Sequence, residues 1–183
     1  MKVLNPNSEN IEAPPLSAST NNDKAALAFS SLNLHQDLLK NLSTLGYENM
    51  TPIQAMSLPE MLVGKDVIAQ GKTGSGKTAA FGLALLEKLK VKRFRIQSMV
   101  LCPTRELADQ VAKEIRKLAR AVHNIKVLTL CGGTPFGPQI GSLEHGAHII
   151  VGTPGRIEEH VIKGTLKLDD LNLLILDEAD RML

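Results

Sequence analysis

The chain has 183 residues, of which 43% are hydrophobic and 3% aromatic, and its 21 basic residues nearly balance 19 acidic ones. This length and apolar content suit one domain with an aliphatic core, and a net charge of +2 is too small to identify a nucleic-acid partner by itself. Cys102 and Cys131 are far apart, which argues against a disulfide framework or a zinc site. Because no apolar run has the length of a signal peptide or a membrane span, we expect a cytoplasmic protein without a membrane partner.

The N-terminal segment differs in composition from the rest of the chain. Residues 1–25 are rich in Asn, Ser, Pro and Ala and contain few large apolar side chains. Such a segment cannot bury enough surface to offset the entropy lost on ordering. We therefore expect residues 1–25 to be a disordered tail and residues 26–183 to form the domain.

Two helices are predicted at the start of the domain. Leucines at helical spacing within His35–Leu45 predict the first helix. Thr51 is typical of an N-cap and Pro52 of the first helical position of a second helix. This second helix should bend or break at Pro59 and end by Gly64.

From residue 66 onwards, short apolar runs alternate with amphipathic segments. The predicted strands are Asp66–Gln70, Ser98–Cys102, Lys126–Cys131, His148–Gly152 and Leu171–Asp177. The predicted helices between them are Thr78–Lys90, Arg105–Arg120, Phe136–Glu144 and Gly155–Lys163. Strands this apolar, joined by helices, indicate an α/β domain whose parallel sheet is covered on both faces.

A glycine-rich loop carries the strongest chemical signal. It follows a predicted strand, opens a predicted helix, matches G-x-x-x-x-G-K-[ST], and consists of Gly71, Lys72, Thr73, Gly74, Ser75, Gly76, Lys77 and Thr78. In such a loop, backbone N–H groups and the helix N-terminus surround phosphate oxygens. Lys77 would reach the terminal phosphates, and the Thr78 hydroxyl would help to hold Mg²⁺. The alternative, a flexible turn with a surface lysine, does not explain the flanking strand and helix.

An acidic pair follows the last predicted strand. The apolar run 173–176 delivers Asp177 to the carboxyl edge of the sheet, where ligands of open α/β sheets bind. Asp177 would coordinate Mg²⁺, and Glu178 would orient or deprotonate the attacking water as the catalytic residue beside Lys77. Alone, the pair would be better explained as an acidic helix N-cap. Together with the phosphate loop, it favours a nucleotide-hydrolysing site.

These residues also carry a resemblance to a known family. Asp177-Glu178-Ala179-Asp180 spells the motif that names the DEAD-box RNA helicases. Other motifs of that family recur in order: Phe29, Gly46-Tyr47, Thr51-Pro52-Ile53-Gln54, Lys72–Thr78, Pro103–Ala108, Gly132-Gly133 and Thr153–Arg156. Over residues 29–183 the chain resembles the N-terminal RecA-like domain of these ATP-dependent helicases. It looks most like the bacterial DbpA-type helicases in Cys102–Val111, Leu128–Gly133, Pro135-Phe136-Gly137 and Asp177–Leu183.

The resemblance implies an adenine-recognition segment within residues 29–54, and hence ATP as the nucleotide. Gln54 would read the adenine edge, since a carboxamide offers both a donor and an acceptor. Phe29 would pack on the base, while Tyr47 and Thr51 would support the pocket. Outside the family context, a Phe before a helix is usually core and a lone Gln is usually solvated surface.

The resemblance also implies contacts with the RNA backbone. Arg105 and Arg156 would make charge-assisted bonds to phosphate. The other implied contacts are Thr104, Gly133, Thr153 and Gly155. Contacts of this kind predict little sequence specificity and a marked salt dependence. The DbpA-type likeness further implies ribosomal RNA, in large-subunit assembly, as the target.

Two hypotheses of function follow from the sequence. The first is an ATP-dependent RNA helicase, acting with a second RecA-like domain in cis that carries an arginine finger. The second is a truncated module that binds nucleotide or RNA without turnover. A DNA-acting or non-helicase ATPase is disfavoured by Gln54 and Phe29.

The family resemblance also implies that part of the first domain is missing. Family members have a further strand, expected between the phosphate-loop strand and the Asp177 strand. Its absence would leave apolar strand edges unpaired, so we expect a marginally stable fragment.

Overall fold

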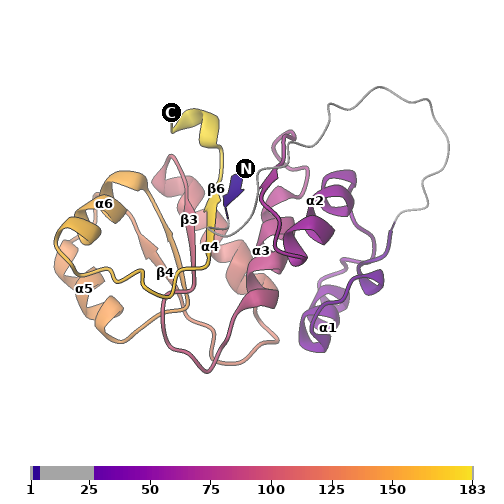
Figure 1. The fold of residues 1–183 in the computed structure, drawn as a ribbon, viewed down its shortest axis with the longest axis horizontal. Helices are drawn as coiled ribbons and strands as arrows, with labels where there is room; N and C mark the ends of the chain where they lie inside the picture. The colour runs from indigo at the N-terminus through magenta and orange to yellow at the C-terminus, as the bar shows by residue number, and fades with distance from the viewer. Residues whose placement is uncertain (1, 5–26, 183) are drawn as a thin grey trace.

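A six-stranded sheet forms the centre of the computed structural model, which describes residues 2–4 and 27–182 (Figure 1). The strands are β1 (Lys2–Leu4), β2 (Val67–Ile68), β3 (Ser98–Leu101), β4 (Val127–Leu130), β5 (Ile149–Gly152) and β6 (Leu173–Leu176). The helices are α1 (Gln36–Thr44), α2 (Pro52–Leu62), α3 (Lys77–Lys88), α4 (Arg105–Leu118), α5 (Phe136–Glu144) and α6 (Pro154–Ile162), with short 3₁₀ turns η1 (Phe29–Ser31) and η2 (Ala179–Arg181). The predicted α/β class is confirmed.

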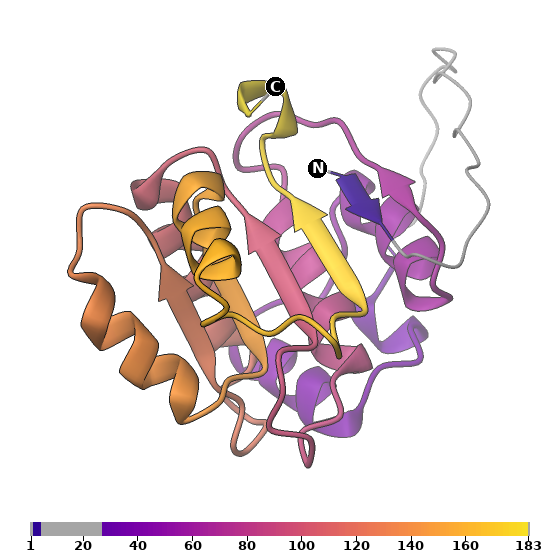
Figure 2. The same cartoon turned by 60° about the vertical axis from the view of Figure 1, so that its left-hand side comes forward.

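Four strands make the parallel part of the sheet, in the order β4-β5-β3-β6. Leu101 of β3 lies opposite Gly152 of β5 and Leu176 of β6, so these strands end in register. The segments that follow them therefore begin at one edge, toward which the strand arrows point in Figure 2. We call this edge the carboxyl edge, and in such sheets it is the usual place for ligands.

Strand β1 occupies the position in which the sequence predicted unpaired edges. It runs antiparallel to both β2 and β6, and Val3 lies opposite Val67 and Ile175. Residues 2–4 are thus a strand, not part of a disordered tail, while residues 1 and 5–26 lie outside the described residues. The physical reason is that exposed backbone donors and acceptors along a strand edge pair with any extended segment that reaches them.

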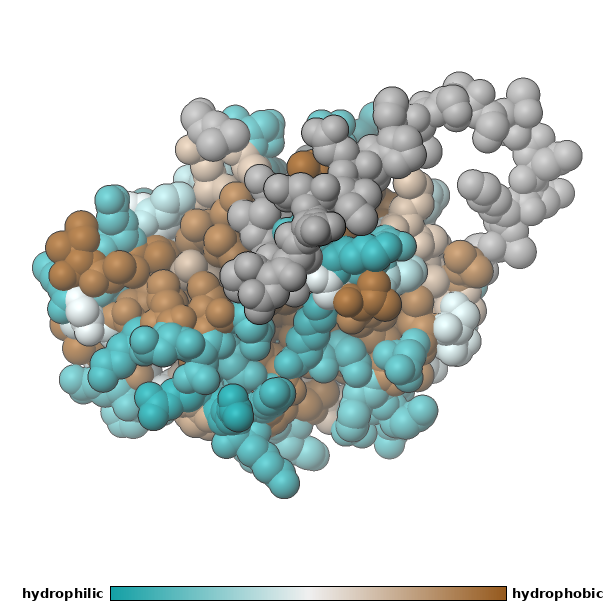
Figure 3. All heavy atoms as spheres, in the orientation of Figure 1, coloured by the Kyte–Doolittle hydropathy of each residue, from teal (hydrophilic) through white to brown (hydrophobic). Residues whose placement is uncertain are grey.

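Apolar clusters cover the two faces of the sheet. On one face, α3 packs between α2 and α4, and all its residues from Ala79 to Leu86 are buried. Gly82 permits this close approach, because a Cβ there would lie 2.9 Å from Leu118 Cδ1. On the other face, Met99 and Ile150 of the sheet are buried against Ile157 of α6, beneath α5, α6 and the chain before β6. Figure 3 shows hydrophilic side chains gathered over the lower part of the domain.

Helix α2 begins as predicted but does not break within its length. The Thr51 hydroxyl accepts from the Gln54 backbone N–H, and Pro52 takes the first helical position. Pro59 lies inside the helix, which continues to Leu62 with the Val63 N–H bonded to the Pro59 carbonyl. Among the residues that the structure describes, none belongs to a helix long and apolar enough to cross a bilayer.

Candidate nucleotide site and nucleic-acid interface

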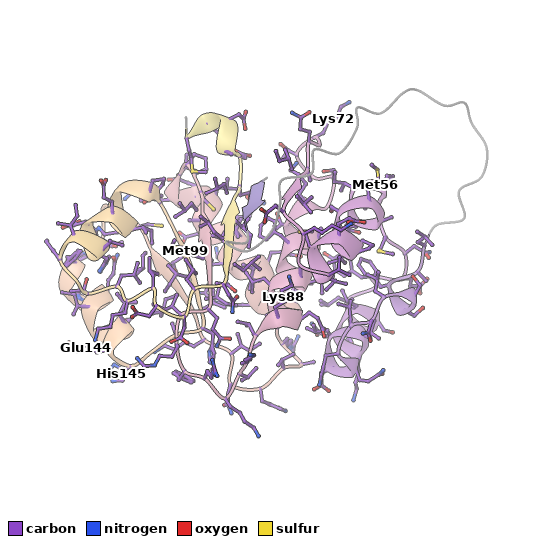
Figure 4. The ribbon with its side chains drawn as sticks, in the orientation of Figure 1. Met56, Lys72, Lys88, Met99, Glu144 and His145 are labelled. Carbon is purple, nitrogen blue, oxygen red and sulfur yellow. The ribbon has the colours of Figure 1, made fainter. Side chains whose placement is uncertain are left out.

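The phosphate loop lies at the carboxyl edge, between β2 and α3. Gly74 and Gly76 have φ angles of +80° and +94°, which side chains with a Cβ rarely adopt. Gly76 is the N-cap of α3, so the first free N–H groups of this helix point at the loop. In Figure 4, Lys72 marks the loop at the upper rim, and Glu144 and His145 lie on the lower side.

Inside the loop, Lys77 is bound by the loop's own backbone. Its Nζ donates to the Gly71 carbonyl at 2.5 Å and to the Lys72 carbonyl at 3.0 Å. Among the described residues, Ser75 Oγ is one of two buried side-chain polar atoms without a hydrogen-bond partner. A loop that binds an anion needs hydrogen-bond donors and positive charge, and the unpaired Ser75 hydroxyl and Lys77 supply both. Thr78 follows in the first turn of α3, half-buried.

The adenine-recognition segment and the phosphate loop, predicted separately, are joined by hydrogen bonds. Thr51 Oγ1 donates to the Ser75 carbonyl at 2.8 Å, and Gln54 Nε2 donates to the Gly76 carbonyl at 3.1 Å. Gln54 Oε1 accepts from the Thr51 backbone N–H at 2.8 Å, which completes a capping box. Any Cβ at Gly76 would overlap the Gln54 amide. Gln54 is only 1% exposed, so reading a base requires it to exchange these partners.

The buried Phe29 ring contacts the half-buried Tyr47 ring. Their rings meet edge to face at 6.2 Å, and Phe29 is 2% exposed. The Tyr47 hydroxyl bonds Glu114 of α4 at 3.0 Å, and burial together with that carboxylate raises the pKa of Tyr47. The structure therefore places the Phe29 ring in the core, where a base cannot stack on it without rearrangement.

The acidic pair lies directly beyond β6. The Asp177 backbone N–H donates to the Leu101 carbonyl at 3.0 Å, and its side chain is buried. Burial raises the pKa of the Asp177 carboxyl, the neighbouring Glu178 raises it further, and the Lys77 ammonium opposes the shift. Asp177 and Lys77 are therefore close enough to interact electrostatically, as a nucleotide site at this edge requires. Within the described residues, no three His, Cys, Asp or Glu side chains converge on a metal position.

Glu178 adopts a strained backbone and has an acidic side chain that is already paired. Its φ of +50° and ψ of 47° lie in the left-handed region, where a non-glycine residue is uncommon. The Glu178 carboxylate bonds the Arg181 guanidinium at 2.6 Å. Arg181 was not among the predicted site residues; its i,i+3 spacing from Glu178 is the signal that could have indicated it.

The implied RNA contacts gather around one loop beyond β4. We call residues 132–134 the glycine loop. Arg105, at the start of α4, donates to the Gly132 carbonyl at 3.2 Å, and a Cβ at Gly133 would overlap the Arg105 guanidinium. Arg156, in the first turn of α6, donates to the Thr134 carbonyl at 3.0 Å. The two arginines therefore hold the glycine loop from either side.

The remaining implied contacts begin the two helices that carry these arginines. Thr104 is the N-cap of α4, and its hydroxyl accepts from the Leu107 N–H at 3.2 Å. Thr153 is the N-cap of α6, and Gly155 is exposed in its first turn. The structure thus brings all six predicted RNA residues to the carboxyl edge. Sequence reasoning missed Gln139 and assigned no role to His160, although both bond into this region.

The chain is similar to known proteins of one family. Residues 51–183 match the family described as DEAD/DEAH box helicase. The chain is 62% identical over 157 residues to the ATP-dependent RNA helicase DbpA of Escherichia coli K12, covering 85% of this chain and 34% of that protein. It is 48% identical over 155 residues to the DEAD-box ATP-dependent RNA helicase CshA of Geobacillus kaustophilus, covering 85% and 33%.

A solved structure agrees with these sequence relatives. The crystal structure of a DEAD-box protein from the hyperthermophile Methanococcus jannaschii superposes with a TM-score of 0.81 and 43% identity, covering 85% of this chain and 42% of that one. The chain spans about a third of the length of the curated relatives that it matches. On the strength of the family match over residues 51–183, the chain belongs to the DEAD/DEAH box helicase family.

Proposed function

We propose that the chain is the ATP-binding and RNA-contacting domain of an ATP-dependent RNA helicase. The observation that carries the proposal is that the candidate nucleotide-binding and RNA-binding residues lie at the same carboxyl edge of the sheet. There the phosphate loop is bonded to Gln54 and lies within electrostatic reach of Asp177. The loop held by two arginines begins at the same edge. Because both groups of residues follow strands that end at this edge, binding of a nucleotide can affect binding of an RNA strand through the few residues between them.

The residues of the loop fit a triphosphate and Mg²⁺. Gly74 and Gly76 let the backbone of the phosphate loop curl, Ser75 adds a hydroxyl without a hydrogen-bond partner, and Lys77 adds positive charge. ATP supplies the phosphoanhydride bond, and Mg²⁺ offsets the phosphate charge. Thr78 and Asp177 would hold the metal.

The chain's own residues would then assist the chemistry by changing partners. Lys77 would leave the carbonyls of Gly71 and Lys72 for phosphate oxygens. Glu178, released from Arg181, would orient the attacking water and accept its proton. Gln54 would select adenine once its amide leaves the Gly76 carbonyl.

RNA is the proposed polynucleotide partner, contacted through its backbone by Arg105, Arg156 and the helix N-termini beside them. We extend the proposal to a second RecA-like domain in cis that supplies an arginine finger, a group worth about 10³–10⁵ in phosphoryl-transfer rate. Ribosomal RNA is the target that the DbpA-type resemblance implies, and the 62% identity to DbpA supports the comparison on which it rests.

RNA-stimulated phosphate release tests the proposal in the full-length protein. Lys77→Ala and Glu178→Gln should each lower the stimulated rate by about 100-fold or more, since each removes a group aimed at the transition state. Lys40→Ala, an exposed lysine on α1, is the matched control and should leave the rate unchanged. Phosphate release that does not respond to RNA would refute the helicase assignment.

A non-catalytic binding module is the second candidate. It is suggested by the exchange of partners that turnover would require, since Lys77 bonds its own loop and Glu178 bonds Arg181. The same assay separates the two functions. A binding module would bind ATP and RNA but show no turnover, even in a single-turnover experiment with excess protein.

A further inference from the structure

A buried glutamine bonds both to the chain around the glycine loop and to Arg156 of α6. Gln139, in α5, is 9% exposed and has four polar contacts. Its Nε2 donates to the Cys131 carbonyl at 3.0 Å and to Thr134 Oγ1 at 2.6 Å. Its Oε1 accepts from the Arg156 guanidinium at 3.1 Å and from His160 Nε2 at 2.9 Å. One side chain thus joins the chain after β4 to α6.

Arg156 determines which way the Gln139 amide points, and His160 completes the arrangement. His160 is fully buried, its Nδ1 lies 2.8 Å from Thr165 Oγ1, and the Phe136 ring stacks on it at 4.2 Å. Because the Arg156 guanidinium can only donate, it requires the amide oxygen. With the amide oxygen fixed by Arg156, His160 Nε2 must carry a proton to bond that oxygen at 2.9 Å. Turning the amide over would set donors against donors on one side and acceptors against acceptors on the other.

We propose that Gln139 is a positioning residue for RNA binding, which holds the Arg156 guanidinium and the glycine loop as one unit. The inference rests on the proposed RNA function of Arg156. Gln139 is too buried to be a main contact for RNA, so its effect passes through the arginine and the loop. Arg156 also bonds the Thr134 carbonyl and Glu159, and Gln139 adds the contact that links its guanidinium to Cys131, the residue directly after β4.

A double-mutant cycle tests the inference in the full-length protein. The readout is the affinity for a labelled single-stranded oligouridylate, measured by fluorescence anisotropy. Gln139→Met keeps the side-chain volume but removes its four hydrogen bonds. It should weaken binding about tenfold when Arg156 is present, the size expected for a lost bond to a charged group. In an Arg156→Ala background the same change should have less than a twofold effect.

The salt dependence gives a second readout that general loosening of the fold would not change. Loss of one phosphate contact lowers the slope of log affinity against log salt by about 0.7 for a single strand. Gln139→Met and Arg156→Ala should lower the slope equally. Gln110→Met, an exposed glutamine on α4, is the matched control and should change neither affinity nor slope. If Gln139→Met lacks a cooperative melt, Gln139→Asn, whose amide is too short for all four partners, takes its place with the same expectation.

The outcomes separate the inference from the function on which it rests. If Arg156→Ala leaves RNA binding unchanged, the proposed RNA role of this site fails and the inference fails with it. If Arg156→Ala weakens binding but the glutamine variants have equal effects in both backgrounds, only the inference is overturned. An unchanged salt slope in a folded Gln139 variant overturns it as well.

Discussion

Replacing Gln54 by alanine should destabilise the domain by an amount that the structure allows us to work out. The part-buried Thr51 N–H would lose its acceptor, which costs about 1–3 kcal/mol for an unsatisfied donor. The bond to the Gly76 carbonyl adds about 1 kcal/mol, because that carbonyl keeps its helical partner Ala80. The sum is about 2–4 kcal/mol. For a domain of this length, that corresponds to a fall in Tm of roughly 5–15 °C.

Two measurements on this variant separate its structural role from its proposed role in adenine recognition. Thermal melting gives the stability, with Gln36→Ala, an exposed glutamine at the start of α1, as the control that should shift Tm by less than about 2 °C. Competition of ATP and GTP against a fluorescent nucleotide gives the base preference, which Gln54→Ala should abolish. A Tm within 1 °C of the parent would refute the hydrogen-bond argument. A lowered Tm with an intact ATP preference would show that Gln54 does not select the base.

Three further changes test the carboxyl edge and the buried hydrogen bonds around Gln139. Gly133→Ala, at φ +76° and in overlap with Arg105, should cost about 1–2 kcal/mol in chemical denaturation and weaken RNA binding, whereas Gly141→Ala, with open space around its Cβ, should do neither. Asp177→Asn should raise Tm at pH 7 and abolish hydrolysis. Burial raises the pKa of the Asp177 carboxyl above its ordinary value of 3.8. The protonated carboxyl therefore contributes its full stability below pH 3.8, and this contribution is lost as the pH rises through the folded pKa. A gain in Tm that is no larger at pH 7 than at pH 4 would contradict this. Burial lowers the pKa of His160, so the contribution of its neutral ring to stability should be complete above pH 6.5 and should fall as the pH drops through the folded pKa. Urea unfolding midpoints measured from pH 7.5 to 5 test this. Midpoints that match those of His160→Gln at every pH would contradict the prediction.

The sequence alone determined the α/β class and the edge of the sheet at which the candidate nucleotide-site residues lie. Apolar runs alternating with amphipathic segments report burial on both faces of a sheet, and burial is a local property that periodicity records. Since parallel strands end at one edge, motifs that follow different strands must meet there. For this reason the phosphate loop, Asp177 and both arginines could be brought together before any coordinates were known.

Only the tertiary structure decided which partners these residues take. Gln54 pairs with Gly76, 22 residues away, and Tyr47 with Glu114, 67 residues away. Such pairings depend on how whole elements pack, which no local pattern encodes. The same limit explains why Phe29 lies in the core, why β1 fills the sheet beside β6, and why a glutamine without any motif of its own joins Arg156 to the glycine loop.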